Sequence, residues 1–129
     1  MIVMKKRIFL VDDDASITSA VRRNLEATGR FDVMDINNPE QAIDKARKFK
    51  PDLVILDVMM PEMDGGAVAE AIADDSTLAD VPIIFLTGIV SAEEVKPSGT
   101  KRGKHIFFAK PVKFEELLAC IDEQIRTSG

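Results

Sequence analysis

The segment PDLVILDVMMPEMDG, residues 51–65, contains the strongest structural signal in the chain. Residues 53–56 form an uninterrupted apolar run between turn-forming residues, which is typical of a strand buried on both faces of a sheet. The run ends on a carboxylate, Asp57, and Pro61 and the Asp64-Gly65 pair then stop regular structure. In an open parallel sheet, ligands bind at the carboxyl ends of the strands. Asp57 is therefore a candidate functional residue, and the alternative is an ordinary polar residue that closes a strand.

Length and composition restrict the class of protein. The chain has 129 residues, enough for one domain with a core and too few for two, so we expect a single domain over residues 1–129 without an output domain. The net charge of −5 argues against direct binding of nucleic acid through phosphate contacts. No apolar run approaches membrane-spanning length, and no signal peptide is evident. The single cysteine, Cys120, excludes an intrachain disulfide and fits a cytoplasmic location.

Strand and helix patterns alternate along the chain. We expect strands at residues 7–11, 31–36, 53–57, 83–87 and 105–109. Helices are expected from Ala15 to Gly29, after Asn37-Asn38-Pro39, from about Gly65, and over residues 114–125. This order predicts an α/β fold, a doubly wound five-stranded parallel sheet with helices on both faces and right-handed crossovers.

Residues 88–104 interrupt this alternation. Pro97, Gly99 and Gly103 break the pattern that a fourth helix would need, so we expect that helix to be irregular or shortened. The segment from Lys96 to Lys104 is also basic within an acidic chain. It is either a solvated loop or a docking surface for an acidic partner, and the sequence leaves both open.

Side chains with useful chemistry follow four of the five expected strands. The group Asp12-Asp13-Asp14 follows the first, Asp57 and Thr87 end the third and fourth, and Lys110 follows the fifth. In a parallel sheet these groups meet at one edge. Clustered carboxylates need a cation, oxygen ligands suit Mg²⁺, and an ammonium group suits phosphate. The set predicts a phosphoryl-transfer site in which one carboxylate is the nucleophile. The alternatives are helix N-terminal charge, a strand-forming threonine and a solvated lysine.

Taken in order, these motifs resemble the receiver domains of two-component response regulators, and the single-domain chemotaxis regulators in particular. The resemblance rests on LVDDD at residues 10–14, LDVMMP at 56–61, MDG at 63–65, FLT at 85–87 and Lys110-Pro111. It implies a flavodoxin-like strand order of 2-1-3-4-5.

The resemblance also implies roles for the acidic residues. Asp57 matches the phosphoacceptor, which takes its phosphoryl group from a phosphohistidine. Asp13 matches the direct ligand of Mg²⁺ or Mn²⁺, and Asp12 matches the residue that acts through water. Asp57 and the main-chain carbonyl of Met59 would complete the protein's share of the metal shell. The partners implied are a sensor histidine kinase or a histidine phosphotransfer protein, and a downstream protein target.

Three further residues match the switch of the family. Thr87 would bind a phosphoryl oxygen and move inward, Lys110 would pair with the phosphoryl group, and Phe107 would rotate inward when Thr87 moves. Such a domain is not an enzyme, although it assists its own phosphotransfer and slow autodephosphorylation. The apolar Met59 and Ile89 occupy positions that flank the attacking water, so we expect a long-lived phosphoryl group. We also expect a monomer or a weak dimer without membrane contact.

Two other classes of protein compete with this hypothesis. A haloacid-dehalogenase-type phosphatase carries Asp-x-Asp-x-Thr/Ser after its first strand, and residues 12–16, DDDAS, fit that pattern with Asp12 as nucleophile. No later strand supplies the second pair of metal-binding aspartates that such an enzyme needs, and Asp57 would have no role. A metal-independent pseudo-receiver would lack the acids or the lysine, and this chain has both.

Overall fold

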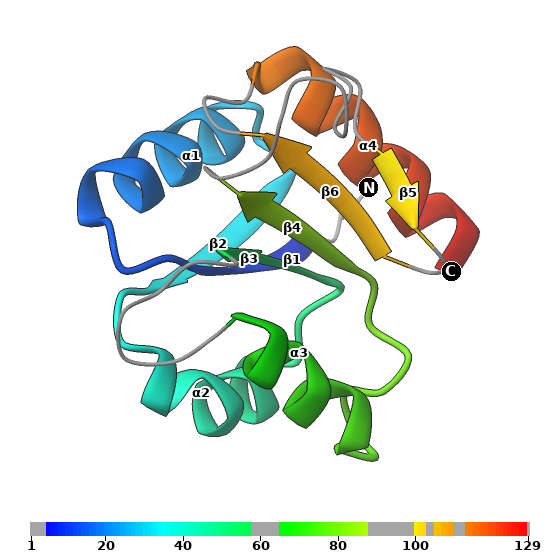
Figure 1. Ribbon diagram of the computed structural model, residues 1–129. Coiled ribbons are helices and arrows are strands. Elements are labelled where there is room, and N and C mark those ends of the chain that lie inside the picture. The colour runs from blue at the N-terminus through cyan, green and yellow to red at the C-terminus, as the bar shows by residue number, and fades with distance from the viewer. Residues whose placement is uncertain (1–4, 58–64, 88–99, 103–104, 110–112, 129) are drawn as a thin grey trace.

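The computed structural model describes residues 5–57, 65–87, 100–102, 105–109 and 113–128 (Figure 1). Its strands are β1 (Lys6–Val11), β2 (Phe31–Ile36), β3 (Leu53–Asp57), β4 (Ile83–Thr87), β5 (Thr100–Arg102) and β6 (His105–Ala109). Its α-helices are α1 (Ala15–Ala27), α2 (Ala42–Phe49), α3 (Gly65–Asp74) and α4 (Phe114–Ser128), and a 3₁₀ helix at Pro39–Gln41 precedes α2. None of the helices in these residues has the length and apolar character needed to cross a bilayer.

All the described strands form a single sheet in the order β2-β1-β3-β4-β6-β5. The first five in that order are parallel to their neighbours, which confirms the expected five-stranded parallel sheet with its order 2-1-3-4-5. The three-residue β5 was not predicted. It pairs antiparallel with β6 and adds a sixth strand at the edge, with Thr100 opposite Phe107 and Arg102 opposite His105. The expected irregular fourth helix falls in residues 88–99, outside the described residues.

Helices cover both faces of the sheet, α1 and α4 on one and α2 and α3 on the other (Figure 1). Successive strand residues point to opposite faces. Accordingly Ile8 and Leu10 of β1 pack with α1 and α4, whereas Phe9 and Val11 pack with α2 and α3. Residues 53–56 of β3 are fully buried, which explains their uninterrupted apolar sequence. Burial on both faces holds the strand ends in fixed positions, and the candidate site residues lie at those ends.

Local signals set where the helices begin and end. The Asp14 carboxylate accepts a hydrogen bond of 2.9 Å from the Ser16 amide, so Asp14 caps α1 as its sequence position indicates. After α1 the chain turns at Gly29, whose φ of +76° favours glycine. Lys50 ends α2 with a φ of +56°, a left-handed conformation that disfavours a residue with a side chain.

One buried carboxylate links α2 to the loop after α3. Asp75 accepts hydrogen bonds from the Thr77 amide at 2.9 Å and the Thr77 hydroxyl at 2.6 Å, and it forms an ion pair with Arg47 of α2. The Thr77 hydroxyl and the Arg47 guanidinium lower the pKa of Asp75 from 3.8 to about 2. Asp75 therefore serves the packing of the α2–α3 face, at a distance in the fold from the strand ends that carry the other aspartates.

Candidate functional site

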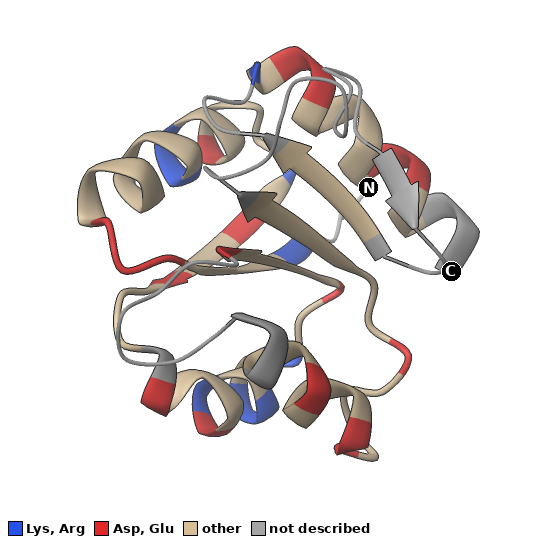
Figure 2. Ribbon diagram, viewed as in Figure 1, with Lys and Arg blue, Asp and Glu red and all other residues tan. Residues whose placement is uncertain are grey.

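Three aspartates converge at the carboxyl edge of the sheet. Asp12 and Asp13 directly follow β1, and Asp57 is the last residue of β3. The two strands are parallel neighbours with Val11 opposite Leu56, so the register brings Asp12 beside Asp57. Carboxylate oxygens of all three residues lie within 4.8 Å of one another. Acidic residues also mark the β1–α1 loop and the tip of β3 in Figure 2. The sequence prediction that these three groups gather is confirmed.

Burial differs among the three carboxylates. Asp12 is fully buried and Asp57 is 3% exposed, whereas Asp13 is exposed to solvent. Buried carboxylates that face one another are stable as anions only when a cation or hydrogen bonds compensate them. An all-oxygen set of two or three carboxylates with one open side fits a hard divalent cation such as Mg²⁺, which retains several waters. The residues present therefore fit the ion that the resemblance implies.

The main chain of the acidic loop is held by hydrogen bonds. The Asp14 amide donates to Asp12 Oδ1 at 3.0 Å, and the Asp12 amide donates to the carbonyl of Ile36 in β2 at 3.1 Å. The side-chain amide of Asn37 donates to the Asp12 carbonyl at 2.8 Å and to the Thr18 hydroxyl at 3.0 Å. In the sequence Asn37 fits the start of the next helix, and its contact with Asp12 was not predicted. The sequence signal for this contact was the position of Asn37 directly after the strand expected to pair with β1, which places it beside Asp12.

Of the other predicted site residues, the structure describes Thr87 and Phe107 but not Met59 and Lys110. Thr87 is the last residue of β4 and lies opposite Ala109 of β6 in the register, so its main chain is at the same edge as Asp57. Phe107 is half-buried, and its ring stacks on that of Phe85 with centroids 4.9 Å apart and planes inclined by 14°. Met59 and Lys110 lie outside the described residues, so their expected contacts with metal and phosphoryl group stay predictions.

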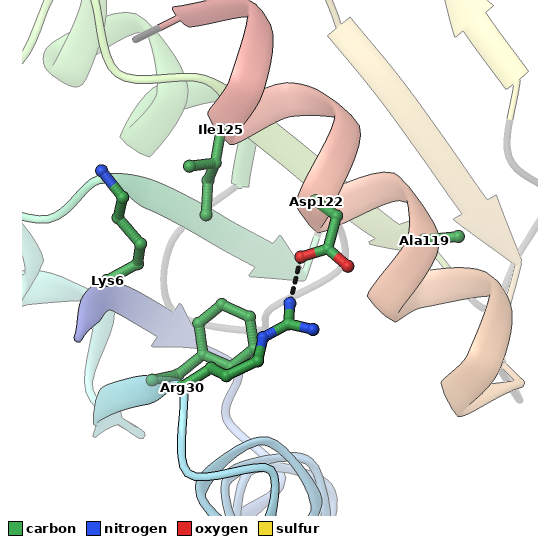
Figure 3. Close-up of a pocket in the computed structure, with 6 residues that line it drawn as sticks. Lys6, Arg30, Ala119, Asp122 and Ile125 are labelled. Atoms are coloured by element: carbon green, nitrogen blue, oxygen red, sulfur yellow. Dashed lines mark hydrogen bonds and ion pairs between the residues drawn. The ribbon is translucent and has the colours of Figure 1, made fainter. Parts of the chain in front are cut away.

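The opposite edge of the sheet contains a hollow of about 420 Å³ with different chemistry (Figure 3). It is lined by Lys6, Arg30, Phe31, Ala119, Asp122 and Ile125. The Arg30 guanidinium lies over the Phe31 ring at 5.0 Å from its centroid and forms an ion pair with Asp122 of α4. Two cations and apolar groups surround one carboxylate there, so this hollow is not a second metal site.

The family of the chain follows from comparison with known proteins. Residues 8–122 match the family model of the response regulator receiver domain. The chain is 35% identical over 125 residues to the alkaline phosphatase synthesis transcriptional regulatory protein PhoP of Bacillus subtilis, covering 97% of this chain and 50% of PhoP. It is 36% identical over 126 residues to the DNA-binding response regulator MtrA of Mycobacterium tuberculosis, covering 98% of this chain and 53% of MtrA.

A solved structure agrees with these relatives. The chemotaxis protein CheY4 of Vibrio cholerae superimposes with a TM-score of 0.79 at 31% identity, covering 93% of this chain and 98% of CheY4. The chain spans about half the length of the curated relatives named above. None of these findings supports the haloacid-dehalogenase alternative. With the acidic cluster at the carboxyl edge of a sheet ordered 2-1-3-4-5, the chain belongs to the response regulator receiver domains of two-component signalling systems.

Proposed function

We propose that Asp57 is the phosphoacceptor of this receiver domain and that its phosphorylation switches the binding of a partner protein. The observation that carries the proposal is the approach of the Asp12, Asp13 and Asp57 carboxylates to within 4.8 Å of one another at the carboxyl edge. Asp57 ends a strand that is buried on both faces, so its carboxylate has a fixed position. An exposed aspartate on a loop would lack that positioning.

In the proposed reaction a carboxylate oxygen of Asp57 attacks the phosphorus of a phosphohistidine. The new O–P bond forms as the N–P bond breaks, which yields an aspartyl phosphate and a neutral imidazole when the second ring nitrogen of the donor carries a proton. Asp13 would hold a divalent cation directly and Asp12 mainly through water, and Asp57 and the Met59 carbonyl would complete the protein's share of the metal shell. Bound Mg²⁺ supplies charge neutralisation for the phosphoryl oxygens.

Thr87, Lys110 and Phe107 form the proposed switch. The main chain of Thr87 lies at the edge that carries Asp57, and Lys110 directly follows Ala109, the residue opposite Thr87. The Thr87 hydroxyl and the Lys110 ammonium contact the phosphoryl group, and an inward shift of Thr87 opens the space into which the Phe107 ring turns. The stacking of Phe107 on Phe85 supports a coupling between Thr87 and Phe107, because Phe85 lies two residues before Thr87 on the same strand.

Response regulators interact with histidine kinases, and the phosphodonor proposed here is such a kinase or a histidine phosphotransfer protein. We place the output in a protein contact rather than a nucleic-acid contact of these 129 residues, because their net charge is −5. The printed name of MtrA describes a DNA-binding regulator, and this chain matches 53% of it. The apolar Met59 and Ile89 support slow autodephosphorylation, since neither side chain orients water.

Phosphorylation with acetyl phosphate and Mg²⁺ tests the proposal. The intact protein should gain the mass of one phosphoryl group, and borohydride reduction of the acyl phosphate should map the modification to Asp57. Asp57→Asn should remain unmodified. Asp52→Asn is the matched control at the other end of β3, where the Asp52 carboxylate accepts a hydrogen bond of 2.8 Å from the Arg7 amide. That variant should be labelled as the wild type is. Modification of Asp12, or labelling unaffected by a chelator, would contradict the proposal.

A further inference from the structure

Asn37 contributes no carboxylate to the acidic cluster. Its side chain instead binds the main chain at Asp12, which carries the Asp12 and Asp13 carboxylates. Its amide nitrogen donates to the Asp12 carbonyl at 2.8 Å and to the Thr18 hydroxyl at 3.0 Å. A carbonyl oxygen only accepts hydrogen bonds, so the nitrogen of the Asn37 amide must face Asp12. The Asp12 amide donates to Ile36, the residue before Asn37, at 3.1 Å. Two consecutive residues, the last of β2 and the one that follows it, thus bind both main-chain polar groups of Asp12.

The Asp12 carbonyl belongs to the peptide unit that joins Asp12 to Asp13. Because a peptide unit is planar, fixing its carbonyl restricts the directions in which both side chains leave the main chain. The Asp12 carboxylate is restricted further by the Asp14 amide, which donates to Oδ1 at 3.0 Å. The contact between Asn37 and Asp12 therefore restricts how the Asp12–Asp13 pair can face Asp57.

The same amide also fixes the loop to helix α1. Thr18 is fully buried in the first turn of α1, and its hydroxyl donates to the Ala15 carbonyl at 3.2 Å while it accepts from Asn37. Asn37 therefore links the end of β2, the acidic loop and the start of α1. Mutual repulsion among carboxylates within 4.8 Å of one another pushes the loop away from Asp57, and this link opposes that movement.

We propose that Asn37 is a positioning residue of the divalent cation site, which preorganises Asp12 and Asp13 before the ion binds. The inference rests on the proposed function, in which these aspartates hold the cation. Residues that orient metal ligands typically contribute about 10–100-fold to metal affinity. Asn37 acts on its ligands through the main chain, so we expect the lower end, about tenfold weaker Mg²⁺ binding for Asn37→Ala.

The neighbouring residue supplies a matched control. Asn38 has the same side chain, but its Oδ1 accepts a hydrogen bond of 3.0 Å from the Glu40 amide and so caps the 3₁₀ helix. In calorimetric titrations of the full chain with Mg²⁺, Asn37→Ala should raise the dissociation constant about tenfold, whereas Asn38→Ala should leave it within about twofold of the wild-type value. Thr18→Val, which removes the second acceptor of Asn37, should have an intermediate effect.

Phosphorylation by acetyl phosphate separates positioning from general damage. For Asn37→Ala, the Mg²⁺ concentration at half-maximal rate should rise about tenfold, and the rate at saturating Mg²⁺ should return to the wild-type value. Wild-type affinity in Asn37→Ala, or an equal loss in Asn38→Ala, would overturn the inference and leave the proposed function intact. Should Asn37→Ala fail to fold, wild-type Mg²⁺ affinity in Thr18→Val would overturn it instead. Absence of Mg²⁺ binding by the wild-type chain would instead refute the proposed function itself.

Discussion

Neutralising Asp57 should stabilise the protein when no metal is bound. Carboxylate oxygens of Asp12, Asp13 and Asp57 lie within 4.8 Å of one another. Two unit charges at that separation repel by about 3.5 kcal/mol at an effective dielectric constant of about 20, and by about 0.9 kcal/mol in bulk water. Asp57 faces two such charges, and each of the two repulsions falls between these limits, the one with exposed Asp13 near the lower limit and the one with buried Asp12 above it. After deduction of about 1 kcal/mol for a weakened hydrogen bond, Asp57→Asn should gain about 1–2 kcal/mol.

The assay is thermal or urea unfolding in the presence of a chelator, followed by the same measurement in Mg²⁺. In chelator, Asp57→Asn should unfold roughly 4–8 °C above the wild type. At a free Mg²⁺ concentration ten times the wild-type dissociation constant, the wild type should gain about 1.4 kcal/mol from binding. The variant lacks one charged ligand and should gain less, so the difference between the two proteins should shrink.

Asp52→Asn is again the control. Asp52 directly precedes β3, and its carboxylate accepts a hydrogen bond from the Arg7 amide at the edge of the sheet opposite the acidic cluster. It should show no gain in chelator and the full response to Mg²⁺. The reasoning is refuted if Asp57→Asn unfolds below the wild type in chelator, or if Mg²⁺ stabilises both proteins equally. Either result would mean that protein contacts alone satisfy the Asp57 carboxylate.

Three further predictions concern residues away from the cluster. Lys50→Gly should raise the free energy of unfolding in urea by about 0.5–1 kcal/mol, because Lys50 has a left-handed φ of +56°; a loss would contradict this. Asp75→Asn should destabilise at pH 7 but not near pH 2. Thr77 and Arg47 lower the pKa of Asp75 in the folded state from 3.8 to about 2. The ionised carboxylate therefore stabilises the fold above pH 4, and this contribution is lost as the pH falls from 4 to 2. A destabilisation by Asp75→Asn that persists at pH 2 would contradict these contacts. Burial raises the pKa of Cys120 to about 11, so Ellman's reagent should react slowly until denaturant is added, and fast reaction of the folded chain would be inconsistent with that burial.

The parallel part of the sheet was predictable because its signals are local. Four of the five parallel strands have an apolar run and β2 has an apolar–polar alternation, and each pattern is followed within two residues by Gly, Pro, Asn or Asp. Parallel pairing then carries the residues that follow the strands to one edge without further information. This is why the approach of Asp12, Asp13 and Asp57 could be predicted although Asp13 and Asp57 are 44 positions apart in the sequence.

Strand β5 and the Arg47–Asp75 pair could not be predicted in the same way. Thr100–Arg102 has three residues and no apolar alternation, so only its pairing with β6 identifies it as a strand. The two-residue connection before His105 begins with glycine and was a weak hairpin signal. Arg47 and Asp75 are 28 residues apart, and their contact depends on how α2 and the loop after α3 pack, which no local pattern specifies.

The neighbouring residues Asn37 and Asn38 differ in whether the local sequence predicts the contacts of their side chains. Both residues fit the start of a helix by type, but only Asn38 uses its side chain there, as the cap of the 3₁₀ helix. Asn37 instead donates to the carbonyl of Asp12, because β1 and β2 are paired in register up to Val11 and Ile36. The chain thus helps to hold its clustered carboxylates in place by fixing their main chain. Removal of the Asp57 charge should therefore stabilise the metal-free fold, whereas removal of the Asn37 amide should weaken metal binding. A cluster of residues that served only the stability of the fold would not show both responses.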